Sequence, residues 1–175
     1  MQIRHLPDNL VNQIAAGEVI ERPAAAVKEV VENAIDAGAT RITVTLRDGG
    51  RSMIRVSDNG IGMENDDLAA CIDRHATSKL PDDDLVNIAS LGFRGEALPS
   101  IGAISRLTIT SRAQGADAYR ICVEGGKKSP VQPASHADGT TVEIADLFYA
   151  TPARLKFLKT PRTEAMNVKG HLEIL

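Results

Sequence analysis

The sequence has no long hydrophobic run. None of its apolar stretches approaches the ~20 residues that a helix needs to cross a bilayer. Residues 1–7 also lack the apolar core of a secretory signal peptide. We therefore predict a cytoplasmic protein without a membrane partner.

Cysteine and histidine are scarce and scattered. Cys71 and Cys122 lie in different predicted elements without CxxC or Cys/His spacing, so we expect reduced thiols. A site built on the four histidines would have to be assembled entirely by the fold. The 20 basic and 23 acidic residues give a net charge of −3, which argues against DNA binding by the whole surface and leaves a local basic patch open.

The two commonest phosphate-binding motifs are missing as well. No G-x-x-x-x-G-K-[ST] pattern occurs, and residues 125–129, GGKKS, resemble it only superficially. No G-x-G-x-x-G fingerprint opens a helix after a strand. The sequence therefore supports neither a Walker-type nor a Rossmann nucleotide site, and a nucleotide would need another architecture.

The length of 175 residues suits one domain with a sizeable core, and no repeat or linker divides it. We therefore predict a single domain over residues 1–175. A helical pattern from about residue 163 reaches Leu175 without a cap or a breaker, which is typical of a helix in a chain that continues.

A helix is predicted over residues 24–37, with Pro23 at its first position and Gly38 just after its end. Its two faces differ. Apolar residues recur at three- and four-residue spacing and predict a core stripe: Val27, Val30, Val31 and Ala34. Polar residues recur at the same spacing on another side: Glu29, Glu32, Asn33 and Asp36.

Residues 41–47 and 52–58 alternate polar and apolar side chains around the turn Asp48-Gly49-Gly50, which predicts an antiparallel hairpin. Asp58 has the phase of Ile54 and Val56, so an acid points toward the core. Further along we predict helices at 65–73 and 96–104, a mobile segment at 74–95, and strands at 106–111, 118–124 and 140–145. This order indicates an α+β fold with helices over one mixed, mostly antiparallel sheet.

Three segments could carry chemistry together. They are Glu29-x-x-x-Asn33 on a helix, Asp58-Asn59-Gly60-Ile61-Gly62 after a strand, and Gly92-Phe93-Arg94-Gly95-Glu96 before a helix. Alone, the first fits a solvated helix face, the second a plain turn, and the third a loop with a helix start. Their joint occurrence in this order indicates a nucleotide site.

The three segments resemble those of the GHKL ATPases, which include topoisomerase II ATPase subunits, heat-shock chaperones, histidine kinases and MutL mismatch-repair proteins. Within this group the sequence is most similar to the MutL family, through strings that cover nearly the whole chain: residues 12–23, 36–40, 74–79, 90–98, 146–149 and 151–154. The resemblance implies a Bergerat-type two-layer α/β sandwich that binds ATP with Mg²⁺.

The resemblance also implies a role for each residue. Glu29 is the general base that activates the attacking water, and Asn33 is the magnesium ligand. Asp58 accepts a hydrogen bond from the adenine amine, which favours ATP over GTP. The remaining residues assigned to the ATP site are Asp36, Gly60 and Gly62, where the backbone passes the purine, and Thr140, which supports the base.

By the same resemblance, residues 74–95 form a lid over the phosphates. Its phosphate-binding residues are Thr77, Ser78, Lys79, Gly92, Phe93, Arg94 and Gly95. A phosphate-sensing lysine is expected from a second domain beyond Leu175, so hydrolysis by this chain alone is expected to be weak or absent. A C-terminal dimerisation domain and most DNA-binding regions are also expected outside it.

The implied function is an ATP-driven switch in DNA mismatch repair that couples mismatch recognition to strand incision. Its expected partners are ATP, a second copy in an ATP-dependent dimer, the mismatch-recognition protein MutS, and DNA. Two alternatives stay open: the ATPase domain of a topoisomerase or chaperone relative, and a module that binds a nucleotide without hydrolysing it.

Overall fold

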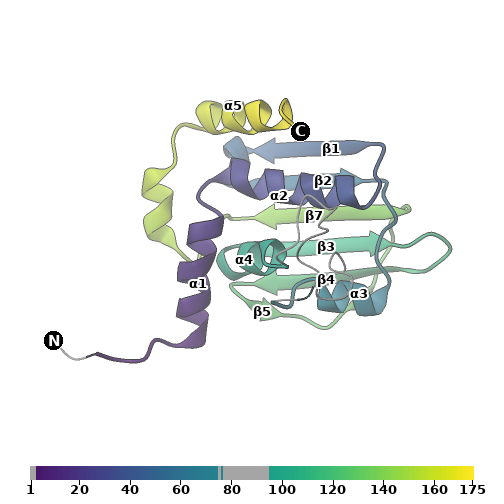
Figure 1. The fold of residues 1–175 in the computed structure, drawn as a ribbon, viewed down its shortest axis with the longest axis horizontal. Coiled ribbons are helices and arrows are strands. Elements are labelled where there is room, and N and C mark those ends of the chain that lie inside the picture. The colour runs from purple at the N-terminus through teal and green to yellow at the C-terminus, as the bar shows by residue number, and fades with distance from the viewer. Residues whose placement is uncertain (1–2, 75, 77–94) are drawn as a thin grey trace, which may run out of the picture.

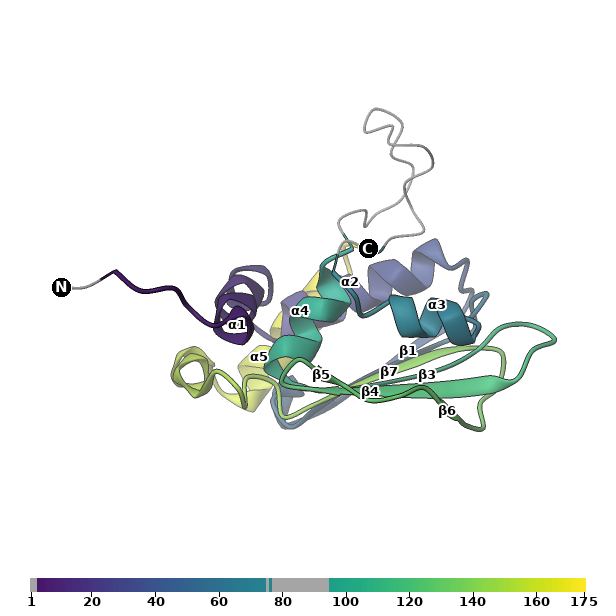
Figure 2. The same cartoon turned by 90° about the horizontal axis from the view of Figure 1, so that it is seen from below.

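The computed structural model describes residues 3–74, 76 and 95–175, which form two layers. One sheet carries helices on one of its faces (Figures 1 and 2). The described strands follow the order β1-β2-β7-β3-β4-β5, with β6 beside β4, and all these pairs are antiparallel. Their bounds are β1 Ile42–Arg47, β2 Met53–Asp58, β3 Arg106–Arg112, β4 Ala118–Glu124, β5 Lys127–Lys128, β6 Gln132–Pro133 and β7 Gly139–Ala145.

Three helices cover one face of the sheet, as the edge-on view in Figure 2 shows: α2 Pro23–Asp36, α3 Asn65–Ala70 and α4 Ala97–Ile104. The helix α1, Asp8–Val19, packs against α4, and α5, Pro161–Leu172, packs against α2 beyond the β1 edge. Two short 3₁₀ segments, η1 Asp48–Gly50 and η2 Pro152–Phe157, complete the described elements. None of the described helices is long and apolar enough to span a membrane.

Alternation along the strands separates the two faces of the sheet. Residues that face the helices are aliphatic and buried, and include Ile54, Val56, Leu107, Ile109, Ile121, Val123, Val142 and Ile144. Each such side chain contributes ~1.5–3 kcal/mol when it leaves water. The opposite face carries hydroxyl and charged residues such as Thr43, Arg55 and Thr108. The core therefore lies only between the sheet and the helices.

The predicted two-layer α+β fold is confirmed. Helix α2 starts with Pro23 at its first position, and Gly38 follows its end with φ +72°. The hairpin forms as β1 and β2, with Ile42 opposite Asp58. Strands β3, β4 and β7 and helices α4 and α5 lie where the pattern predicted them.

Some elements differ from the prediction. Helix α3 ends at Ala70 and not at Asp73, because the chain continues in a turn that the amide of Asp73 closes on the Ala70 carbonyl at 2.9 Å. Helix α1 and η2 were not predicted. The predicted mobile segment 74–95 lies largely outside the described residues.

Candidate functional site

Asp58 is the last residue of β2 and lies half-buried on the helix-facing side of the sheet, as its phase predicted. It stands opposite Thr140 of β7 in the strand register. Burial raises the pKa of its carboxyl above 3.8, and the backbone amides of Gly60 and Thr140 together with nearby His136 offset part of that rise. The site therefore holds a carboxylate that is poorly solvated.

The loop after Asp58 is fixed to the end of α2. The side-chain oxygen of Asn59 accepts hydrogen bonds from the amides of Thr40 and Arg41, at 3.0 and 2.8 Å. The amide of Ile61 donates to the carbonyl of Ala37 at 3.0 Å. These contacts place the last turn of α2 directly beside the loop that follows Asp58.

Gly60 and Gly62 are required by contacts within the protein. A Cβ at Gly60 would lie 2.8 Å from the Ala37 carbonyl oxygen. Gly62 has φ +68°, and a Cβ there would lie 2.0 Å from the carbonyl oxygen of Arg112. Their absence of side chains lets the loop pass between α2 and the end of β3.

We expect Gly62→Ala to destabilise the protein by roughly 3 kcal/mol or more, because it adds a backbone clash to left-handed strain. Gly115→Ala is the matched control, since Gly115 has φ +76° and nothing within 4 Å of the added Cβ. It should cost only about 1–2 kcal/mol. Urea denaturation measures the free energy of unfolding of both variants. If both lost the same stability, the close approach of residue 62 to Arg112 would not add to the cost of Gly62→Ala.

The polar flank of α2 divides into two parts. Glu32 is 8% exposed and pairs with Lys28 at 3.6 Å, so it belongs to the packing of the helix. Glu29 and Asn33 are half-buried and lie one turn apart, four residues from each other along the helix. Asp36 occupies the last turn, next to the loop that follows Asp58.

Helix α4 begins at Ala97, just after the glycine-rich motif. Gly95 has φ +61°, and a Cβ there would lie 2.6 Å from the carbonyl oxygen of Ala76, so the chain approaches itself closely at this point. Arg74 pairs with Glu96 at 3.9 Å. The predicted phosphate-binding residues Thr77, Ser78, Lys79, Gly92, Phe93 and Arg94 lie outside the described residues.

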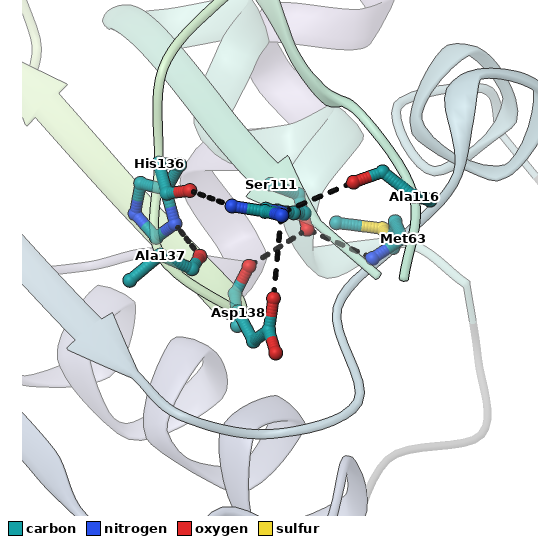
Figure 3. A network of polar contacts seen from close by, with 8 residues as sticks. Met63, Ser111, Ala116, His136, Ala137 and Asp138 are labelled. Carbon is teal, nitrogen blue, oxygen red and sulfur yellow. Dashed lines mark hydrogen bonds and ion pairs between the residues drawn. The ribbon is translucent and has the colours of Figure 1, made fainter. Parts of the chain in front are cut away.

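Sequence reasoning missed one residue, Ser111 of β3. It is fully buried and its hydroxyl lies 2.7 Å from that of Thr140. Figure 3 shows its hydroxyl oxygen accepting a hydrogen bond from the amide of Met63, at 2.8 Å. A polar residue in the phase of Leu107 and Ile109 was the available signal, the same kind that drew attention to Asp58.

The described surface has two hollows that are not lined by the polar flank of α2. One of about 300 Å³ is bounded by α1, α4 and the β4–β5 turn. Another, of about 440 Å³, lies on the sheet face opposite the helices. Neither is lined by Glu29, Asn33 or Asp58, so the candidate site is defined by its side chains and backbone contacts.

Residues 20–124 match the family described as histidine kinase-, DNA gyrase B-, and HSP90-like ATPase. This match covers more than half of the chain and includes Glu29, Asn33 and Asp58. The chain belongs to this ATPase family.

Within this ATPase family, the chain is similar to curated MutL proteins. The DNA mismatch repair protein MutL of Paramagnetospirillum magneticum is 64% identical over 176 residues, which cover 100% of this chain and 29% of that protein. MutL of Rhodospirillum rubrum is 67% identical over 95% of this chain and 27% of its own length. The predicted resemblance to MutL is confirmed, and the chain spans less than a third of these relatives.

Solved structures agree with this assignment. The Aquifex aeolicus MutL ATPase domain complexed with ADP is 34% identical, with a TM-score of 0.70 over 88% of this chain and 54% of that chain. The N-terminal domain of a DNA repair protein is 32% identical, with a TM-score of 0.75 over 90% of this chain and 46% of that chain. The ATPase family thus accounts for both the sequence motifs and the fold.

Proposed function

We propose that this chain binds ATP with magnesium and forms the ATP-hydrolysing domain of a MutL-type mismatch-repair protein. The observation that carries the proposal is that Asp58 lies opposite Thr140 at the end of β2, with the C-terminal end of α2 bonded to the loop that follows. The relative with ADP bound supports a nucleotide as the ligand.

The adenine ring would lie over the end of β2. Asp58 is an acceptor on the helix-facing side, and an exocyclic amine is a donor that a half-buried carboxylate can bind. Guanine has a carbonyl oxygen at the corresponding position, so it would face the carboxylate with a second acceptor. This arrangement favours ATP over GTP.

The phosphates would lie between α2 and the start of α4. The N-terminus of a helix favours anions because its first amides have no partner inside the helix, and α4 starts next to Gly95. The proposed phosphate ligands outside the described residues are Thr77, Ser78, Lys79, Gly92, Phe93 and Arg94. Asp36, in the last turn of α2, remains a proposed residue of the ATP site.

Asn33 would hold the magnesium ion through its amide oxygen, a hard donor of the kind that this ion prefers. When bound, magnesium neutralises charge on the phosphates and orients them for attack. Glu29, one turn earlier on the same flank, would accept a proton from the attacking water. A base and a metal ligand on one rigid helix keep a fixed separation during the reaction.

Turnover is proposed to be slow and to need a lysine from a following domain. Nucleotide occupancy would act as the switch, and a second copy, MutS and DNA would respond to it. Coupling to strand incision is part of the same proposal. These partners and the coupling are proposed for a protein of the length of the curated relatives. This chain spans less than a third of that length.

Calorimetric titration of the 175-residue chain with ATP, ADP and GTP tests the binding proposal. We expect ATP and ADP to bind, GTP to bind at least about tenfold more weakly, and magnesium to strengthen ATP binding. Glu143→Gln on the opposite sheet face is the control and should leave all affinities unchanged. Failure to bind ATP or ADP at millimolar concentration would overturn the proposal.

A further inference from the structure

Ser111 joins three segments of the candidate adenine site through one hydroxyl group. It lies in β3 directly opposite Thr140 in the strand register, and its side chain is fully buried. Its hydroxyl lies within hydrogen-bond distance of the Thr140 hydroxyl at 2.7 Å, the Gly139 carbonyl at 3.1 Å and the Met63 amide at 2.8 Å. Figure 3 shows the contact between Met63 and Ser111.

The direction of each hydrogen bond follows from the donors available. The Met63 amide can only donate, and the Gly139 carbonyl can only accept. The Ser111 hydroxyl has one proton, and it donates that proton to the Gly139 carbonyl. The contact between the two hydroxyls is then a hydrogen bond only if Thr140 donates to Ser111. All three contacts are satisfied together in this arrangement alone.

This arrangement uses the only proton of the Thr140 hydroxyl. Thr140 then presents lone pairs, and no donor, to a ligand beside Asp58. Asp58 is also an acceptor, and one of its oxygens already accepts from the Gly60 amide at 2.8 Å. The base end of the site is therefore lined by acceptors, and an exocyclic amine with two N–H groups is complementary to it.

We propose that Ser111 is a positioning residue that fixes Thr140 as a hydrogen-bond acceptor and thereby sets the preference for a 6-amino purine over a 6-oxo purine. This inference rests on the proposed ATP site. Ser111 acts through Thr140 and the loop that ends at Met63, without touching the nucleotide itself.

Inosine triphosphate is the probe, because it carries an oxygen in place of the amine of ATP. In Ser111→Ala the proton of Thr140 is released and can be donated to that oxygen. We expect the ATP-to-ITP preference of the 175-residue chain to fall about tenfold. Loss of the acceptor for the Met63 amide weakens the loop in both complexes alike, so it changes both affinities and not their ratio.

Three further variants separate positioning from general loss of structure. Ser111→Thr keeps the hydroxyl and should restore the preference. Thr140→Val removes the oriented group, so adding Ser111→Ala to it should change the preference no further. Ser57→Ala is the matched control and should leave the preference unchanged. Ser57 of β2 makes a similar hydroxyl contact with Thr141 of β7 at 2.9 Å, on the opposite face of the sheet.

The outcomes are distinct. If the wild type binds neither ATP nor ITP, the proposed function itself fails. If the wild type prefers ATP and Ser111→Ala keeps that preference, or loses affinity for both nucleotides equally, the positioning role of Ser111 is wrong. If Ser111→Ala does not fold, Ser111→Cys has nearly the same shape with a weak donor, and the same fall in preference is expected.

Discussion

Replacing Glu29 with glutamine is expected to lower ATP turnover by about 10²–10⁴-fold and to leave ATP affinity nearly unchanged. Glutamine has the same length and shape as glutamate, but its amide cannot accept a proton from water near neutral pH. Glu29 is half-buried on the flank of α2, one turn before Asn33. The substitution therefore removes the proposed base and keeps the helix that carries it.

The measurement is phosphate release under single-turnover conditions, paired with calorimetry for ATP binding. Because turnover is proposed to need a lysine from a following domain, the assay uses the 175-residue chain and, in parallel, a chain extended to the length of the curated relatives. The expected separation of turnover from affinity is the mark of an interaction made in the transition state.

Glu32→Gln is the matched control on the same helix. Glu32 is 8% exposed and pairs with Lys28, so its replacement should lower stability and leave the turnover of the folded fraction unchanged. If Glu29→Gln in the extended chain turned over ATP at the wild-type rate, the assignment of Glu29 as the base would be wrong.

The helix and the hairpin that hold the candidate site could be predicted, because their local sequence patterns agree with how they pack in the fold. Pro23 and Gly38 mark the ends of α2, and alternation through Ile54, Val56 and Asp58 defines both the hairpin and the face that carries the acid. In each element the apolar residues recur with the period of that element, 3.6 residues in the helix and 2 in the strands, and they form its buried face. The acid in a core-facing phase and the long MutL-like strings together distinguished the site from a solvated helix face.

The rest depends on contacts that one sequence does not reveal. Helix α1 was missed because its apolar residues do not mark a buried stripe: Leu10, Val11 and Ile14 stay 38–51% exposed. Glycine is needed at position 62 because the backbone there lies close to Arg112, fifty residues further along the chain. Only the folded loop shows this contact. Ser111 was missed because its partners come from two other segments, at Met63 and Gly139–Thr140.

Replacing Asp58 with asparagine is expected to raise the Kd for ATP by about 10–100-fold while making the nucleotide-free protein more stable near neutral pH. The amide oxygen of asparagine can still accept the hydrogen bond from the Gly60 amide. Its NH₂ group then faces the adenine amine as a second donor, so neither group has an acceptor. The same NH₂ group suits the 6-oxo group of ITP, and the ATP-to-ITP preference should fall or reverse.

The stability change has the opposite sign because of the cost of burying the charge. Burial raises the pKa of Asp58 above 3.8, so the folded state holds a proton to higher pH than the unfolded chain does. The penalty for ionised Asp58 is therefore absent below pH 3.8, grows as the pH rises through the raised pKa, and is complete above it. Asparagine is neutral throughout and avoids this penalty.

Thermal unfolding from pH 3 to pH 8 without nucleotide measures this difference. The gain of Asp58→Asn over the wild type should be present at neutral pH and vanish as the pH approaches 3.8. Asp117→Asn, in the exposed β3–β4 turn, is the control and should change neither stability nor affinity. A variant that bound ATP as the wild type does, or that lost stability at neutral pH, would contradict a desolvated carboxylate kept for adenine.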